Sequence, residues 1–123
     1  MSASEQSETC VRNFIEKIWN QHDLGCLPEY LHSEFIDHSI PFRCFQNVAG
    51  FATYLKKMNE DIFHNTLINE LITVGDFVLV DVKIRIVPRK SSSAEEINAE
   101  HIHGFRVFKL SNGKIKGHWE FLD

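Results

Sequence analysis

Apolar residues in the first half of the chain recur every three or four positions, the spacing of one face of an α-helix. The first such stripe follows Ser and Thr residues and predicts a helix from Glu5 to Gln21, which Gly25 can close. A proline at a first helical position predicts a short helix over 28–32. A third stripe predicts a helix that begins at Gly50 and includes Ile62.

Between the last two helices, residues 34–39 are predicted as a short strand or bend. After residue 65 the apolar period changes to two, which is typical of β-strands. The alternation predicts strands over 66–74, 77–87, 99–110 and 115–123. A polar, Ser-rich stretch from Pro88 to Asn98 is expected to be an exposed loop. Helices followed by a run of strands indicate an α+β fold, with the helices packed on one face of a curved antiparallel β-sheet.

The last two strands are joined by Asn112 and Gly113, the strongest short-range signal for a β-hairpin. A two-residue loop there pairs Ser111 with Lys114, and counting outward places Arg106 opposite Trp119. Arg106 then lies on the apolar face of the sheet. Because a buried guanidinium without a partner is costly, this predicts a partner, an anion or a wet cavity. If residues 77–87 pair with residues 99–110, the opposite, charged face collects Asp81, Lys83, Arg85, His101, His103 and His118.

Length and composition suit a single domain over residues 1–123, since 123 residues with 43 % apolar content can bury a sizeable core. A net charge of -4 argues against nucleic acid and anionic membrane partners. No apolar stretch approaches eighteen residues and the N-terminus lacks a secretory pattern, so we expect a soluble, cytoplasmic protein. The three cysteines lack Cys-x-x-Cys spacing and are expected to be reduced thiols.

This pattern resembles the nuclear transport factor 2-like superfamily, and within it the SnoaL-like polyketide cyclase and ketosteroid isomerase branch. The residues that carry the resemblance are Phe35 to Ser39, Val74 to Val78, and above all His103 to Phe108 with Asn112 to Ile115 and His118-Trp119. The likeness covers nearly the whole chain and implies a cone-shaped fold, in which helices close a curved sheet around a pocket. It also implies frequent dimerisation through the outer sheet face. The fold hosts isomerases, cyclases, dehydratases, epoxide hydrolases and non-catalytic modules, so it selects no single function.

The resemblance also points to catalytic positions. In the cyclase branch an aspartate acting as general acid/base commonly lies two residues after the hairpin glycine, and this chain has Arg106 there. Asp37 and His38 fall where the isomerase branch has its acidic residue, so either is a candidate base. Arg106 stays protonated and is expected to act as an anion clamp or oxyanion donor. Alternatively, Asp37 pairs with Arg106 or caps a turn, and His38 is a satisfied, half-buried histidine.

Four aromatic residues are candidate substrate-binding groups, although their spacing also suits a hydrophobic core. They are Trp19, Tyr54, Phe108 and Trp119. His101 and His103 with Lys83 resemble a metal or phosphate cluster, but no acidic or cysteine ligand completes the set. We therefore expect no metal, and the absence of a Gly-rich phosphate loop predicts no nucleotide cofactor.

Together these features predict a pocket protein that binds a small hydrophobic or anionic ligand. The leading hypothesis is a cofactor-independent isomerase, cyclase or lyase that acts on a hydrophobic carbonyl or carboxylate compound by general acid/base chemistry. The alternative is a non-catalytic ligand-binding or dimerisation domain, in which Arg106 is tied to Asp37 and the interior is filled. The aromatic outer sheet face, with His101, His103, Phe105, Val107 and His118, predicts a homodimer.

Overall fold

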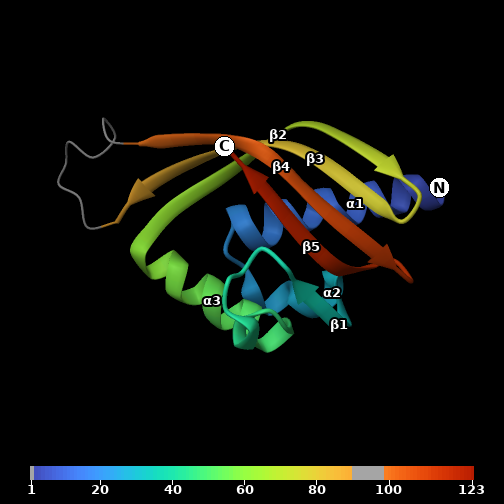
Figure 1. Cartoon of the computed structure of the whole chain (residues 1–123), viewed down its shortest axis with the longest axis horizontal. Helices are drawn as coiled ribbons and strands as arrows, with labels where there is room; N and C mark the ends of the chain where they lie inside the picture. Colours follow the sequence, from blue (N-terminus) through green and yellow to red (C-terminus); the bar gives the residue numbers. More distant parts are fainter. Residues whose placement is uncertain (1, 90–98) are drawn as a thin grey trace.

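The computed structural model describes residues 2–89 and 99–123, and it is an α+β fold with helices packed on a curved, open sheet of five strands. Figure 1 shows the long strands β2 to β5 side by side, with α2 and α3 below them. The helical segments are α1 (Ala3–Phe14), η1 (Ile15–Asn20), η2 (Leu24–Cys26), α2 (Leu27–Tyr30), η3 (Arg43–Phe45) and α3 (Val48–Asp61). The strands are β1 (Leu31–Asp37), β2 (Ile62–Val74), β3 (Phe77–Pro88), β4 (Glu100–Ser111) and β5 (Lys114–Leu122).

The first predicted helix is present, but its last part is not α-helical. The Ser2 side chain caps α1 by accepting a hydrogen bond from the Glu5 amide at 3.2 Å. The helix continues as η1, a π-helix, and His22 follows it with a φ of 59°. The helix therefore ends before Gly25, and the prediction that this glycine closes it is wrong because His22 already takes the left-handed conformation.

The boundary between α3 and β2 also differs from the prediction. Asn47 caps α3 by accepting a hydrogen bond from the Gly50 amide at 2.8 Å, so the helix begins two residues before Gly50. It ends at Asp61, and Ile62 is already the first residue of β2. The predicted Ser-rich loop lies largely in residues 90–98, outside the described residues. Among the helices that the structure describes, none is long and apolar enough to cross a membrane.

The sheet has the order β1-β5-β4-β3-β2, and β2 to β5 pair antiparallel as predicted. The segment predicted as a short strand or bend is β1, which pairs parallel with β5 at the edge of the sheet. The sheet is therefore mixed rather than purely antiparallel. The register of β1 is irregular between Leu31 and Ile36, so its burial does not alternate cleanly and the sequence pattern of a strand is weak.

The turn between β4 and β5 is the predicted one. Asn112 and Gly113 have φ values of 53° and 77°, as a type I′ turn requires. Ser111 pairs with Lys114, which confirms the predicted start of the hairpin. Strands β3 and β4 also pair as predicted, with Val80 opposite Arg106 on the inner face of the sheet.

Beyond the turn, the hairpin register departs from the prediction because β5 contains a bulge. Leu110 pairs with Ile115, but Lys109 pairs with Gly117, which leaves Lys116 as the extra residue. Arg106 consequently lies opposite Glu120, and the predicted pairing of Arg106 with Trp119 is wrong. A slip of one residue exchanges the two faces of a strand.

The bulge moves His118 and Glu120 to the inner face and Trp119 to the outer face. The placement of His118 on the charged outer face is therefore wrong, since this side chain is only 1 % exposed. The remaining predicted outer residues are on that face, where the His103 Nε2 lies 2.6 Å from the Asp81 Oδ1. The core between helices and sheet is apolar and aromatic, and its largest members are Phe14, Phe35, Phe51 and Phe108.

Candidate functional site

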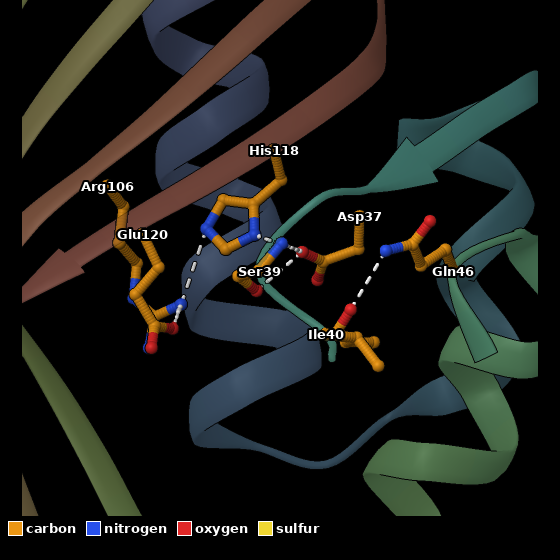
Figure 2. A network of polar contacts seen from close by, with 7 residues as sticks. All are labelled: Asp37, Ser39, Ile40, Gln46, Arg106, His118 and Glu120. Carbon is orange, nitrogen blue, oxygen red and sulfur yellow. Dashed lines mark hydrogen bonds and ion pairs between the residues drawn. The ribbon is translucent and has the colours of Figure 1, made fainter. Parts of the chain in front are cut away.

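Four polar side chains meet on the inner face of the sheet, where the bulge in β5 directs His118 inward. Figure 2 shows the His118 imidazole between Asp37 at the end of β1 and Arg106 on β4. The His118 Nδ1 lies 2.9 Å from the Asp37 Oδ1, and its Nε2 lies 3.3 Å from the Arg106 Nη1. The same Arg106 nitrogen forms an ion pair with the Glu120 Oε2 at 2.7 Å. The four side chains therefore form one continuous chain of contacts.

The contacts of His118 define its protonation state. A guanidinium can only donate hydrogen bonds, so the His118 Nε2 accepts from Arg106 and its Nδ1–H donates to the Asp37 carboxylate. This arrangement requires a neutral imidazole. Burial lowers the pKa of His118 below its ordinary value, although the neighbouring Asp37 carboxylate acts in the opposite direction.

Asp37 is held by several donors, all on one oxygen. Its Oδ1 accepts hydrogen bonds from the Ser39 amide at 2.9 Å and from the Ser39 hydroxyl at 2.5 Å, in addition to the one from His118. Burial alone would raise the pKa of Asp37, but these hydrogen bonds and the nearby His118 outweigh it and lower the pKa. Asp37 is thus an ionised carboxylate at neutral pH. Among the residues that the structure describes, none donates a hydrogen bond to its Oδ2.

The backbone around Asp37 is held by a neighbouring turn. The Asp37 amide donates a hydrogen bond to the Gln46 carbonyl oxygen at 2.8 Å. The Gln46 side chain in turn donates to the Ile40 carbonyl oxygen at 2.8 Å (Figure 2). These two bonds fix the end of β1 and the turn that follows it, and so position the carboxylate.

Arg106 is buried to an unusual degree for a cation, since its side chain is 12 % exposed. Its guanidinium carbon lies 4.1 Å from the centre of the Trp19 ring, in a cation–π contact. Burial lowers the pKa of Arg106, and the Glu120 and Asp37 carboxylates raise it. The Nε atom is buried without a hydrogen-bond partner in the described part of the chain. A free, buried donor of this kind is suited to a ligand oxygen or a water molecule.

The polar cluster faces a small pocket of about 70 Å³, large enough for several water molecules. The pocket is lined by Trp19, Asp37, Ser39, Ile40, Phe51, Tyr54, Leu55, Met58, His64, Thr66, Arg106 and Glu120. Burial lowers the pKa of His64 to about 4, with the charges of His22 and two arginines acting in the same direction. The His64 Nε2 lies 2.8 Å from the Asn59 Oδ1. A neutral His64 therefore donates from Nε2 and presents its Nδ1 as an acceptor.

The predicted candidates divide into two groups. The structure brings Asp37, Arg106, Trp19 and Tyr54 together on the pocket wall. Phe108 is fully buried and packs its ring 5.8 Å from that of Trp19, so it supports the wall from behind.

His38 and Trp119 lie away from this wall. Of the adjacent pair Asp37 and His38, it is Asp37 that lines the pocket. The exposed His38 stacks on Trp119, with ring centres 4.6 Å apart and an angle of 7° between the planes. This answers the question, left open by the sequence, of which of the two faces the pocket. It also corrects the expected position of Trp119 beside Arg106.

His118 and Glu120 are the site residues that sequence reasoning missed. Strict alternation from the turn assigns them to the outer face, and only the bulge moves them inward. The available signal was Gly117, because an isolated glycine in a strand pattern often marks a bulge or a close approach. A Cβ atom at Gly117 would indeed lie 2.9 Å from the Trp119 ring.

A metal centre was not expected. Within residues 2–89 and 99–123, no group of three or more His, Cys, Asp or Glu side chains is arranged to hold a metal ion. The polar cluster supplies a carboxylate, a guanidinium and an imidazole within hydrogen-bonding distance of one another.

Comparisons with known proteins agree on the fold. The family model described as SnoaL-like polyketide cyclase matches residues 9–123. A candidate SnoaL-like polyketide cyclase from Jannaschia sp. CCS1 superposes with a TM-score of 0.83 at 13 % identity, covering 100 % of this chain and 90 % of that one. An LEH-like epoxide hydrolase from M. tuberculosis gives 0.80 at 15 % identity, with 99 % and 86 % covered. TsrD from Streptomyces laurentii gives 0.79 at 13 % identity, with 100 % and 91 % covered. No curated protein matches the sequence significantly.

Proposed function

The chain belongs to the SnoaL-like polyketide cyclase family, and on this premise we propose that it catalyses proton transfer next to the carbonyl group of a small hydrophobic compound. The family fold supports a protein with a small-molecule pocket. The observation that carries this proposal is that an Asp37 carboxylate oxygen and the buried Arg106 Nε, both without a hydrogen-bond partner among the described residues, line one pocket wall. A cytoplasmic location, which free cysteines suit, belongs to the same proposal.

Enolisation requires a base for the proton on the α-carbon and a donor for the oxygen that becomes negative. In our proposal the Asp37 Oδ2 takes the α-proton, and the electron pair of the C–H bond moves into the carbonyl group. The Arg106 Nε–H donates to the resulting enolate oxygen. Asp37 then gives a proton back to carbon, after exchange with solvent where water reaches it, as the carbonyl group re-forms, so the step needs no co-reactant. His118 and Ser39 act as positioning residues, because they hold Asp37 through its other oxygen.

The charges in the pocket favour a neutral ligand. Asp37 and Glu120 contribute two carboxylates, whereas Arg106 contributes one positive charge and His118 is neutral. A carboxylate ligand would therefore add a third negative charge at short range to a site that already has an excess of one. A ketone oxygen accepts the Arg106 hydrogen bond without that repulsion. We accordingly favour a carbonyl compound over a carboxylate.

Exchange of α-hydrogens tests this reaction without knowledge of the natural substrate. 2-Octanone in D₂O loses its α-proton signals in ¹H NMR as deuterium enters, and we expect the protein to accelerate this loss. Asp37→Asn should reduce the acceleration by about 10²- to 10⁴-fold. Arg106→Gln should reduce it by about 10²- to 10³-fold.

The neighbouring His38 supplies the control. His38→Asn changes an exposed side chain outside the pocket and should leave the exchange rate unchanged. Exchange no faster than in buffer, or equal rates for Asp37→Asn and the unmodified protein, would contradict the proposed reaction.

A second candidate function is non-catalytic ligand binding. The observation in its favour is that the ion pair of Arg106 with Glu120 and the His118–Asp37 hydrogen bond already satisfy most of the polar groups in the cluster. Arg106 is then a structural residue as much as a ligand-binding one. Binding of 2-octanone without any α-exchange would support this alternative.

The outer face of the sheet supports the further proposal of a homodimer. Large apolar side chains are exposed there, among them Phe105, which is 47 % exposed, and Phe121, which is 61 % exposed. Phe105 and Phe121 are direct partners across β4 and β5, so they form one continuous patch. A second copy would cover this patch and remove it from water.

A further inference from the structure

An open, apolar groove lies beside the pocket, between α3, the turn at η3 and the first residue of β2. Its volume is about 530 Å³. It is lined by Phe42, Phe45, Thr53, Tyr54, Lys57, Met58, Asp61 and Ile62. Phe42 is 58 % exposed although it is a large aromatic side chain, so part of the groove wall presents hydrocarbon to water.

The groove and the pocket share part of their walls. Tyr54 and Met58 line both. They are four residues apart on α3, so they lie one above the other on the same side of the helix. Both are only partly buried against the core. The pocket and the groove therefore adjoin each other at these two side chains.

The pocket and the groove differ in size. The pocket, at about 70 Å³, is far below the range of roughly 300–1,000 Å³ that is typical of small-molecule sites. The groove, at about 530 Å³, lies within that range. The pocket alone thus takes the polar end of a ligand, and any larger apolar part needs the adjoining space.

The groove is also apolar where the pocket is charged. Its two charged residues, Lys57 and Asp61, have opposite signs and are neighbours at helical spacing, so they add no net charge to the groove. The groove therefore does not disfavour an apolar ligand body, whereas a charged group on the ligand would gain nothing there.

Resting on the proposed function, we infer that this groove holds the apolar body of the ligand whose carbonyl group lies between Asp37 and Arg106. The ligand class is then a neutral ketone or aldehyde that carries an extended apolar chain or ring. Tyr54 and Met58 contact the ligand at the junction of its two parts. Residues of α3 and of the turn before it accordingly set the preference for ligand length.

A series of methyl ketones tests the inference on the full chain. Binding of 2-butanone, 2-hexanone and 2-octanone is measured by isothermal titration calorimetry at neutral pH. Each additional buried methylene should strengthen binding by about fourfold, until the groove is filled. Thr53→Trp places a bulky ring in the groove from an exposed position of α3 and should remove the dependence on chain length.

Phe42→Ser provides a milder change, and Leu67→Ser is its matched control. Both side chains are 58 % exposed, but Leu67 lies on β2 outside the groove. Phe42→Ser should weaken binding of 2-octanone several-fold and leave 2-butanone unaffected, whereas Leu67→Ser should change neither. Equal affinity for all three ketones, or equal losses in the two serine variants, would overturn the groove assignment.

The two proposals fail in different ways. If α-exchange is accelerated equally for 2-butanone and 2-octanone and binding does not depend on length, the reaction stands and the groove assignment is wrong. If affinity rises with chain length but no exchange occurs, the groove assignment stands and the catalytic proposal is wrong.

Discussion

Replacing Asp37 with asparagine and with alanine separates the charge of this residue from its hydrogen bonds. The Asp37 Oδ1 accepts hydrogen bonds from His118 and from the amide and hydroxyl of Ser39. An asparagine side chain has the same shape and keeps one acceptor oxygen, so Asp37→Asn can retain all three bonds and lose only the negative charge. Asp37→Ala removes the acceptor altogether.

The expected cost follows from the kind of hydrogen bond that is lost. A hydrogen bond to a charged group contributes about 1.5–3 kcal/mol and a neutral one about 0.5–1.5 kcal/mol, while removal of the buried charge itself offsets part of the loss. We expect Asp37→Asn to lower the unfolding free energy by about 1–2 kcal/mol. Asp37→Ala leaves the His118 Nδ1–H and the Ser39 amide unpaired, at about 1–3 kcal/mol each, and should cost about 3–5 kcal/mol.

Urea unfolding followed by circular dichroism at pH 7 measures both variants, and an unchanged slope shows that the two-state comparison is valid. Asp76→Asn, which makes the same exchange at an exposed turn, is the control and should leave the midpoint unchanged. Equal losses of unfolding free energy in Asp37→Asn and Asp37→Ala would refute the hydrogen-bonding scheme, because the acceptor oxygen would then contribute nothing to stability. A more stable Asp37→Ala variant would refute it as well.

Three other predictions concern pH, packing and assembly. Burial lowers the pKa of His64 from 6.5 to about 4, so as the pH falls the unfolded chain binds a proton on this residue before the folded chain does. The unfolding free energy should therefore fall between pH 6.5 and about 4. Urea titrations over this range should show a flatter profile for His64→Gln. Gly104→Ala places a Cβ atom 2.5 Å from the Phe121 carbonyl oxygen, and thermal unfolding should reveal a loss of about 1–3 kcal/mol. Phe121→Lys should convert a dimer to a monomer in sedimentation, and a monomeric unmodified protein would contradict the proposed assembly.

Local patterns in the sequence were sufficient to predict most of the helices and strands. Helical spacing located α1 and α3, and strict alternation located β3 and β4. The turn at Asn112 and Gly113 followed from the backbone conformation that these two residues favour. In each case the information lies within a few neighbouring residues, where propensity and periodicity act directly.

Long-range pairing was the part that the sequence did not reveal. The parallel contact of β1 with β5 joins segments about eighty residues apart, and no local pattern encodes it. The single extra residue at Lys116 then reverses the faces of β5. Arg106 could be proposed as a site residue because it lies on an apolar strand face, and Asp37 because the family resemblance has an acidic residue near that position. His118 and Glu120 could not, because their contacts with those two residues depend on the bulge.

The π-helix η1 makes the length of the N-terminal helix as important as its composition. A residue in a regular helix is rotated by about 100° from the previous one, so an inserted or deleted residue turns every later side chain by that angle. The wide turn of η1 accommodates one residue more than an α-helical turn would. It begins directly after Phe14 in the core and contains Trp19, whose ring lies against Arg106. In a continuous α-helix of unchanged length, the indole would be rotated by about 100° and could no longer cover the guanidinium while Phe14 kept its place. Homologues that lack this extra residue should therefore have an uninterrupted α-helix and still place an aromatic side chain over the arginine.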